Sequence, residues 1–99
     1  MNKYRVFVRG ENFLLKVDSQ DQKLGFYVTV FVEATDEHAA ETKAMDLLRN
    51  DPKLVNNILN TKADAPLMFV DELEELEAFE EPYLPRTGFS FFPQDSLVD

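Results

Sequence analysis

The sequence has no cysteine, a single histidine and only three glycines, and these gaps exclude several kinds of site. Without cysteine the chain forms neither a disulfide framework nor a thiolate metal site. His38 stands alone, so chemistry that needs a Cys/His pair or two histidines is excluded too. The glycines at positions 10, 25 and 88 are too far apart to form a phosphate-binding loop.

A long apolar run is also missing. The longest run, residues 26–32, is interrupted by Thr29 and is far too short to cross a bilayer. The first residues alternate charged and apolar side chains, which is not the pattern of a signal peptide. We therefore expect no membrane association and a cytoplasmic protein, for which the lack of cysteine is also typical.

Basic residues are scarce in the last third of the chain. Residues 1–62 hold nine Lys/Arg and nine Asp/Glu, whereas residues 63–99 hold only Arg86 against ten acids. The last third therefore carries the whole net charge of −9. Such a field repels phosphate backbones and favours basic partners, so we expect no nucleic-acid binding.

The most informative stretch runs from residue 25 to residue 50. Residues 26–32 alternate with period two, which predicts a central strand, and Thr35 followed by two acids predicts the start of a helix. An apolar stripe in that helix should pack on the sheet. The side chains expected to be strongly buried are Val28, Val30, Val32, Ala44, Leu47 and Leu48.

Proline and turn-forming residues mark the boundaries of the other elements. The main helix should end near Asn50, and Asp51-Pro52 should begin a short second helix over residues 52–59, followed by a loop over residues 60–66. Before the central strand we expect a strand over residues 3–9 and another over 13–17. A turn or bulge at residues 9–12 should separate them, and a polar turn should occupy residues 18–23.

Residues 67–79 combine strand-forming and helix-forming residues. Leu67 to Val70 suits a buried strand, whereas the glutamate-rich residues that follow have high helix propensity. A strand is favoured over a helix, and it would place Phe69, Leu73 and Phe79 on one face.

Two prolines and a cluster of phenylalanines characterise the end of the chain. Pro82 and Pro85 exclude a helix, residues 86–88 should form a turn, and residues 89–92 should form a last strand. That strand either completes its own sheet or pairs with the edge of a second copy, so a homodimer is also expected.

Together these elements predict one α+β domain over residues 1–93, with a frayed C-terminal tail over 94–99. The architecture should be an antiparallel sheet of four to five strands, with one main helix and one short helix packed on one face.

The clearest candidate for a site is a run of acidic residues between positions 71 and 81. We interpret this run as a docking surface for a basic protein partner. The alternative is a solvated face that pairs with Lys3, Arg5 and Arg9 across neighbouring strands. The spacing does not fit a calcium loop, and no metal or other cofactor is expected. The run consists of Asp71, Glu72, Glu74, Glu75, Glu77, Glu80 and Glu81.

No catalytic constellation is visible, so we expect a non-catalytic interaction module and no enzyme. The order of two strands and a helix with an acidic start resembles small bacterial antitoxin and immunity domains over about half the chain. This resemblance rests on pattern and assigns no residue a role. The alternative is a small enzyme or ligand-binding domain with a pocket between helix and sheet, lined by Tyr4, Tyr27 or Tyr83.

Overall fold

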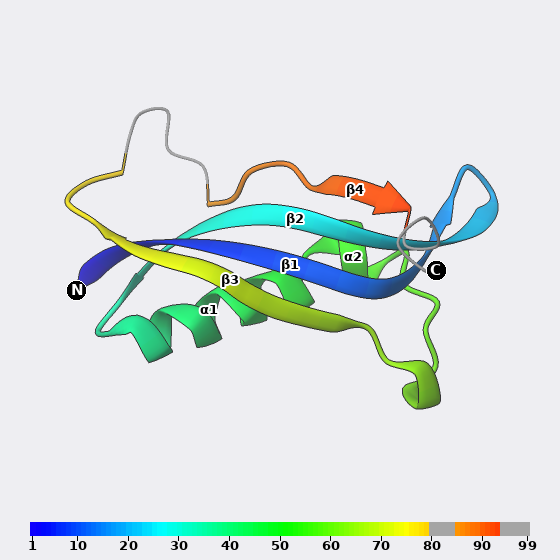
Figure 1. Ribbon diagram of the computed structural model, residues 1–99, viewed down its shortest axis with the longest axis horizontal. Helices are drawn as coiled ribbons and strands as arrows, with labels where there is room; N and C mark the ends of the chain where they lie inside the picture. The colour runs from blue at the N-terminus through cyan, green and yellow to red at the C-terminus, as the bar shows by residue number, and fades with distance from the viewer. Residues whose placement is uncertain (80–84, 94–99) are drawn as a thin grey trace.

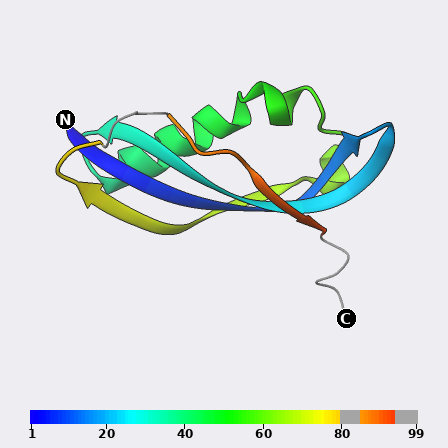
Figure 2. The ribbon, with the colours of Figure 1, turned by 90° about the horizontal axis from the view of Figure 1, so that it is seen from above.

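The computed structural model describes residues 1–79 and 85–93. The elements are β1 (Asn2–Val17), β2 (Gln20–Ala34), α1 (Glu37–Arg49), α2 (Pro52–Val55), a 3₁₀ turn (Lys62–Asp64), β3 (Leu67–Leu76) and β4 (Ser90–Pro93). The strands form one antiparallel, curled sheet in the order β3-β1-β2-β4 (Figure 1). Helix α1 lies along one side of the sheet (Figure 2). The α+β fold is therefore confirmed, with four strands, one main helix and one short helix.

The core lies between α1 and the two long strands. Directly opposite residues of β1 and β2, such as Val6 and Val30, share this inner face of the sheet. Small alanines on α1 let the helix lie close to the strands. The buried side chains are Tyr4, Val6, Val8, Phe13, Leu15, Leu24, Phe26, Val28, Val30, Val32, Ala34, Ala40, Ala44, Leu48 and Leu54.

Leu47 is the one predicted core residue that the structure does not bury. Its side chain is 46% exposed, whereas Ala40, Ala44 and Leu48 are buried. These three residues recur every four positions, and this row faces the sheet. Leu47 lies on the flank of the row, where it lines a shallow cavity with Arg86. The stripe that faces the sheet is narrower than predicted.

Helix α1 begins one residue later than predicted. The cap is Asp36 and not Thr35: the Asp36 carboxylate accepts a hydrogen bond from the Ala39 N–H at 2.8 Å. The predicted end of the helix is confirmed, with Asn50 as the C-terminal cap.

Helix α2 is shorter than the predicted span of residues 52–59. Its start is confirmed, with Asp51 as the cap and proline at the first position. After Val55 the backbone pairs with β1 instead: the Leu59 N–H donates to the Leu14 carbonyl at 2.8 Å, and Ile58 forms a bridge with Leu15. Bonds to the sheet replace those that a longer helix would make.

The two strands predicted before the central strand are a single strand. A bulge between Gly10 and Phe13 shifts the β1–β2 register, and Asn12 adopts a positive φ of 60° there. Asn60 joins the loop that begins there to this bulge: its side-chain amide donates to the Asn12 carbonyl at 2.9 Å, and its side-chain oxygen accepts from the Leu14 N–H at 2.8 Å. The polar turn is also tighter than predicted, because β2 begins at Gln20.

Strand β3 confirms the strand prediction for residues 67–76 but not the predicted face. Its register with β1 shifts between Phe7 and Val8, so Asp71 is an extra residue that has no partner in the β1–β3 register. The bulge reverses the alternation: Phe69 lies opposite Arg9 and has an outer-face position, whereas Leu73 lies opposite Val6, has an inner-face position and packs against the core. Bulge positions are not visible in a hydrophobic pattern.

Residues 86–88 do not form the predicted turn. They run along β2: the Thr87 N–H donates to the Thr29 carbonyl at 2.9 Å, and Arg86 forms a bridge with Val30. The last strand is confirmed as β4, and it pairs with β2 of its own chain. The homodimer stays a prediction. Pro82 and the tail over 94–99 lie outside the described residues.

Candidate functional site

The acidic run lies on both faces of β3. Asp71, Glu72 and Glu74 lie on the outer face, which is the face turned away from α1, because they bond to or lie opposite outer-face residues of β1. Glu75 lies opposite Tyr4 and so has the inner-face position, and Glu77 follows the end of the strand. Glu80 and Glu81 lie outside the described residues.

Two of these acids pair with arginines of β1. Arg5 Nη2 lies 3.3 Å from Glu74 Oε2, and Arg9 Nε lies 3.0 Å from Asp71 Oδ2. Arg9 also pairs with Glu11. The alternative interpretation, a face that pairs with basic residues across neighbouring strands, is therefore correct for these two acids and for Arg5 and Arg9.

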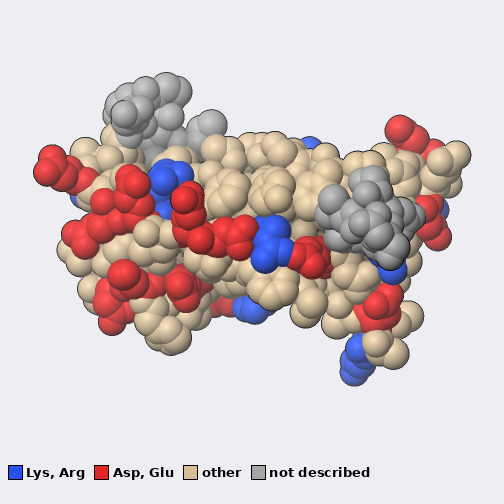
Figure 3. All heavy atoms as spheres, viewed as in Figure 1, with Lys and Arg blue, Asp and Glu red and all other residues tan. Residues whose placement is uncertain are grey.

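Three acids of the run have no basic partner within residues 1–79 and 85–93. They are Glu72, Glu75 and Glu77, and all three are exposed. The one basic residue of the last third does not compensate them, because Arg86 pairs with Asp51. Figure 3 shows acidic side chains gathered over β3 and toward the start of α1. The acidic run therefore keeps a negative charge that its internal ion pairs do not compensate.

The Asp51–Arg86 ion pair should also make the stability of the fold depend on pH. Burial raises the pKa of the Asp51 carboxyl, but hydrogen bonds from Arg86 and the Lys53 N–H, with the charges of both side chains, outweigh it and hold the pKa below its ordinary value. A depressed pKa in the folded state stabilises the fold above the unfolded pKa, and this contribution is lost as the pH falls through the folded pKa.

We therefore expect Asp51→Asn to cost about 1 kcal/mol at pH 7 and less at pH 3, because only the charged form makes the ion pair. Urea denaturation of both proteins at the two pH values measures this difference. Asp46→Asn, which changes an exposed ion pair within α1, is the matched control. A cost for Asp51→Asn that is the same at both pH values would contradict the assigned role of the charge.

A groove runs along the inner side of β3. It consists of two adjoining cavities of about 430 and about 390 Å³, which share Arg49 and Met68. Residues of both helices and of β3 line it, namely Glu41, Thr42, Met45, Leu48, Arg49, Leu54, Val55, Met68, Phe69 and Val70, with Phe13, Ile58 and Pro66 at one end. Sequence reasoning missed this groove, although the alternation of Met68 and Val70 is its local signal.

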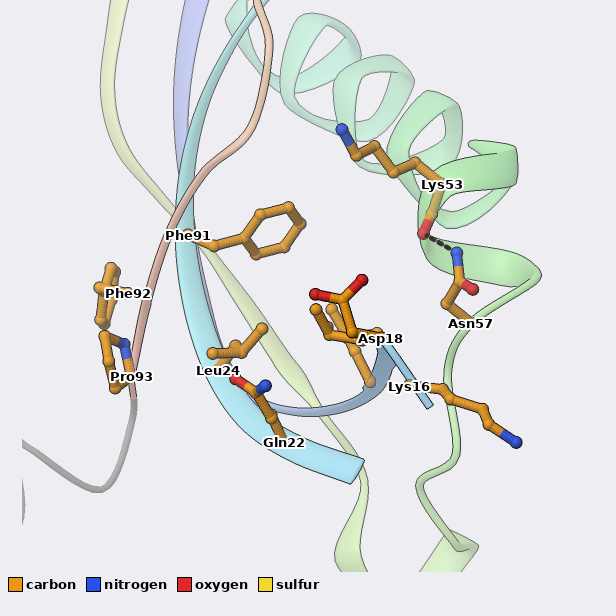
Figure 4. Close-up of a pocket in the computed structure, with 11 residues that line it drawn as sticks. Lys16, Asp18, Gln22, Leu24, Lys53, Asn57, Phe91, Phe92 and Pro93 are labelled. Atoms are coloured by element: carbon orange, nitrogen blue, oxygen red, sulfur yellow. Dashed lines mark hydrogen bonds between the residues drawn. The ribbon is translucent and has the colours of Figure 1, made fainter. Parts of the chain in front are cut away.

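A separate cavity of about 510 Å³ lies between the β1–β2 hairpin, α2 and β4 (Figure 4). Phe91 and Leu24 point into it, and the Asp18 carboxylate and the Lys53 side chain lie at its rim. The Asn57 side chain is held by a hydrogen bond of 2.9 Å to the Lys53 carbonyl. The cavity has an apolar floor and a mixed-charge rim.

The single histidine and the tyrosines expected to line a pocket do not lie together in the described part of the chain. His38 is exposed in the first turn of α1. Tyr4 is buried in the core, whereas Tyr27 is 39% exposed on the outer face, so the two do not line one pocket. Tyr83 lies outside the described residues. Within the part of the chain that the structure describes, no group of three His, Asp or Glu residues is placed to hold a metal ion.

Aromatic rings form a row across the outer face. The rings of Phe7 and Tyr27 stack with centroids 5.5 Å apart, and Phe92 lies 5.2 Å beyond Tyr27. Rings beside basic side chains are typical of surfaces that stack nucleotide bases. Here the rings pack against one another, and Arg5 and Arg9 already pair with acids, which leaves little positive charge for a phosphate backbone.

The chain matches no protein-family model, no curated protein and no solved structure. Among the described residues, no helix has the length and apolar character needed to cross a membrane.

Proposed function

We propose that this chain is a non-catalytic interaction module that binds a basic protein through the acids of β3, and of the residue that follows its end, that have no internal ion pair. The observation that carries the proposal is the charge left on this strand after internal pairing. Glu72, Glu75 and Glu77 are exposed and have no basic partner in the described part of the chain. Uncompensated charge of one sign speeds association with an oppositely charged surface and disfavours other partners.

The chemistry of such a partner follows from the same charges. A protein that presents lysine and arginine side chains would replace the missing ion pairs, and a toxin nuclease or another nucleic-acid-binding protein has such a surface. The resemblance to antitoxin and immunity domains supports this class of partner. The cysteine-free composition supports a cytoplasmic site of action.

The test is capture of a partner from the source cell with two charge variants. Glu72→Gln/Glu75→Gln removes two uncompensated charges of β3. Asp18→Asn/Asp21→Asn removes the same charge from the β1–β2 hairpin and is the matched control. We expect the intact protein and the control to retain one stoichiometric basic protein. The β3 variant should bind it about tenfold more weakly, and about 1 M salt should release it.

The four substituted residues are all exposed, so both variants should keep their stability to within about 0.5 kcal/mol. A partner that is not basic, or equal capture by both variants, would contradict the proposal.

The cavity of Figure 4 supports a second candidate, a small-ligand domain. A thermal-shift screen of small molecules distinguishes this candidate, because a bound ligand raises the unfolding temperature by mass action.

A further inference from the structure

Strand β3 has a free edge. It spans Leu67–Leu76 and pairs with β1 on one side, and no other strand of the described residues pairs with its second side. In a strand, the N–H and C=O groups of alternate residues point to opposite sides, so half of those in β3 point away from β1. Such a row is a template for one more strand.

The groove beside this edge would take the side chains of an added strand. Met68 and Val70 have inner-face positions on β3, and Met45 lines the same cavity from α1. All three are partly buried hydrophobic residues packed against the core. An added strand places every second side chain on the inner face, next to these residues, so apolar side chains fit there.

The other side chains of an added strand would lie on the outer face. There they would lie beside Glu72 and Glu74, of which only Glu74 has a partner in the described residues. Basic side chains suit these positions, since opposite charges on neighbouring strands stabilise a sheet. A second copy of β3 would bring acid against acid, so the charge disfavours self-association through this edge.

We infer that the free edge of β3 binds one extended segment of the basic partner as a fifth strand, with basic residues on its outer face and apolar residues in the groove. This inference rests on the proposed function and adds how the partner is held. The opposite edge of the sheet is less suitable, because β4 has four residues and ends in Pro93, which has no N–H to donate.

The test uses two capped eight-residue peptides of equal composition. In the first, lysine and valine alternate; in the second, four lysines precede four valines. Binding to the full chain is measured at low salt, and amide hydrogen exchange is followed for residues 67–76. We expect the alternating peptide to bind at least about tenfold more tightly and to slow exchange at alternate amides of β3.

Backbone methylation of the peptide tests the hydrogen bonds themselves. One alternating peptide carries N-methyl groups on all valines and the other on all lysines. Only one set of amides can face β3, so one methylated peptide should bind about tenfold more weakly than the other.

Equal binding of the two unmethylated peptides without slowed exchange in β3 would overturn the strand addition. The proposed function would stand in that case if Glu72→Gln/Glu75→Gln still weakened capture of the partner. Absence of peptide binding would overturn the strand addition as well, and loss of the capture result would separately overturn the proposed function.

Discussion

Leu48→Ala is expected to lower the free energy of unfolding by about 2–5 kcal/mol. The Leu48 side chain is 1% exposed and lies where the last turns of α1 meet the sheet and α2. Its removal costs the transfer free energy of the buried methyl groups and leaves a cavity that the helix closes only partly. Urea denaturation followed by circular dichroism measures the loss.

Leu47→Ala is the matched control, because it changes the same residue type one position earlier in the same helix. Leu47 is on the exposed flank of α1, so its truncation should change stability by no more than about 0.5 kcal/mol. Equal losses in the two variants would mean that α1 is rotated relative to the sheet. The pair therefore tests the orientation of the helix as well as its burial.

This part of the fold follows from sequence because two strong local patterns agree. The period-two alternation in β2 and the apolar row in α1 each need only their own neighbours to be recognised. Leu47 shows the limit of such a pattern. Its spacing fits the stripe, and only the close contact made by Ala40 and Ala44 decides how wide the buried stripe is.

The candidate site depends on contacts that no local pattern contains. Glu74 pairs with Arg5 across 69 positions of the chain, and this pair exists only in the observed β1–β3 register. The bulge at Asp71 sets that register and moves Phe69 to the outer face. The acidic run could therefore be found in the sequence, but its division into paired and uncompensated acids could not.

The groove could not be predicted from local sequence either. Met45 and Met68 line one cavity although a loop and α2 separate them in the chain. The sequence around each of them predicts only an ordinary core methionine, a residue type that adapts to irregular gaps. Their shared position follows from the placement of β3 at the edge of the sheet beside α1, which is a property of the topology.

Phe26→Ala should have a still larger effect, with a loss of about 3–5 kcal/mol. The Phe26 side chain is fully buried and contacts the rings of Phe13, Phe89 and Phe91 at centroid distances of 4.9, 5.1 and 6.0 Å. It therefore joins β1, β2 and the β4 segment in one cluster. Chemical denaturation of the variant measures the loss, which should be much smaller if the ring were on the surface.

A substitution at Gly10 tests the position of the Phe26 ring more directly, because Gly10 lies opposite Phe26 in the β1–β2 register. A Cβ at this position would lie 2.2 Å from the Phe26 ring, so Gly10→Ala should cost about 1–3 kcal/mol by overpacking. In the Phe26→Ala background the ring is gone, and the same methyl group reduces the freedom of the unfolded backbone. There Gly10→Ala should be neutral or stabilising. Gly88→Ala, where a Cβ meets no atom within 4 Å, is the control. Equal effects of Gly10→Ala in both backgrounds would show that the ring does not lie over Gly10.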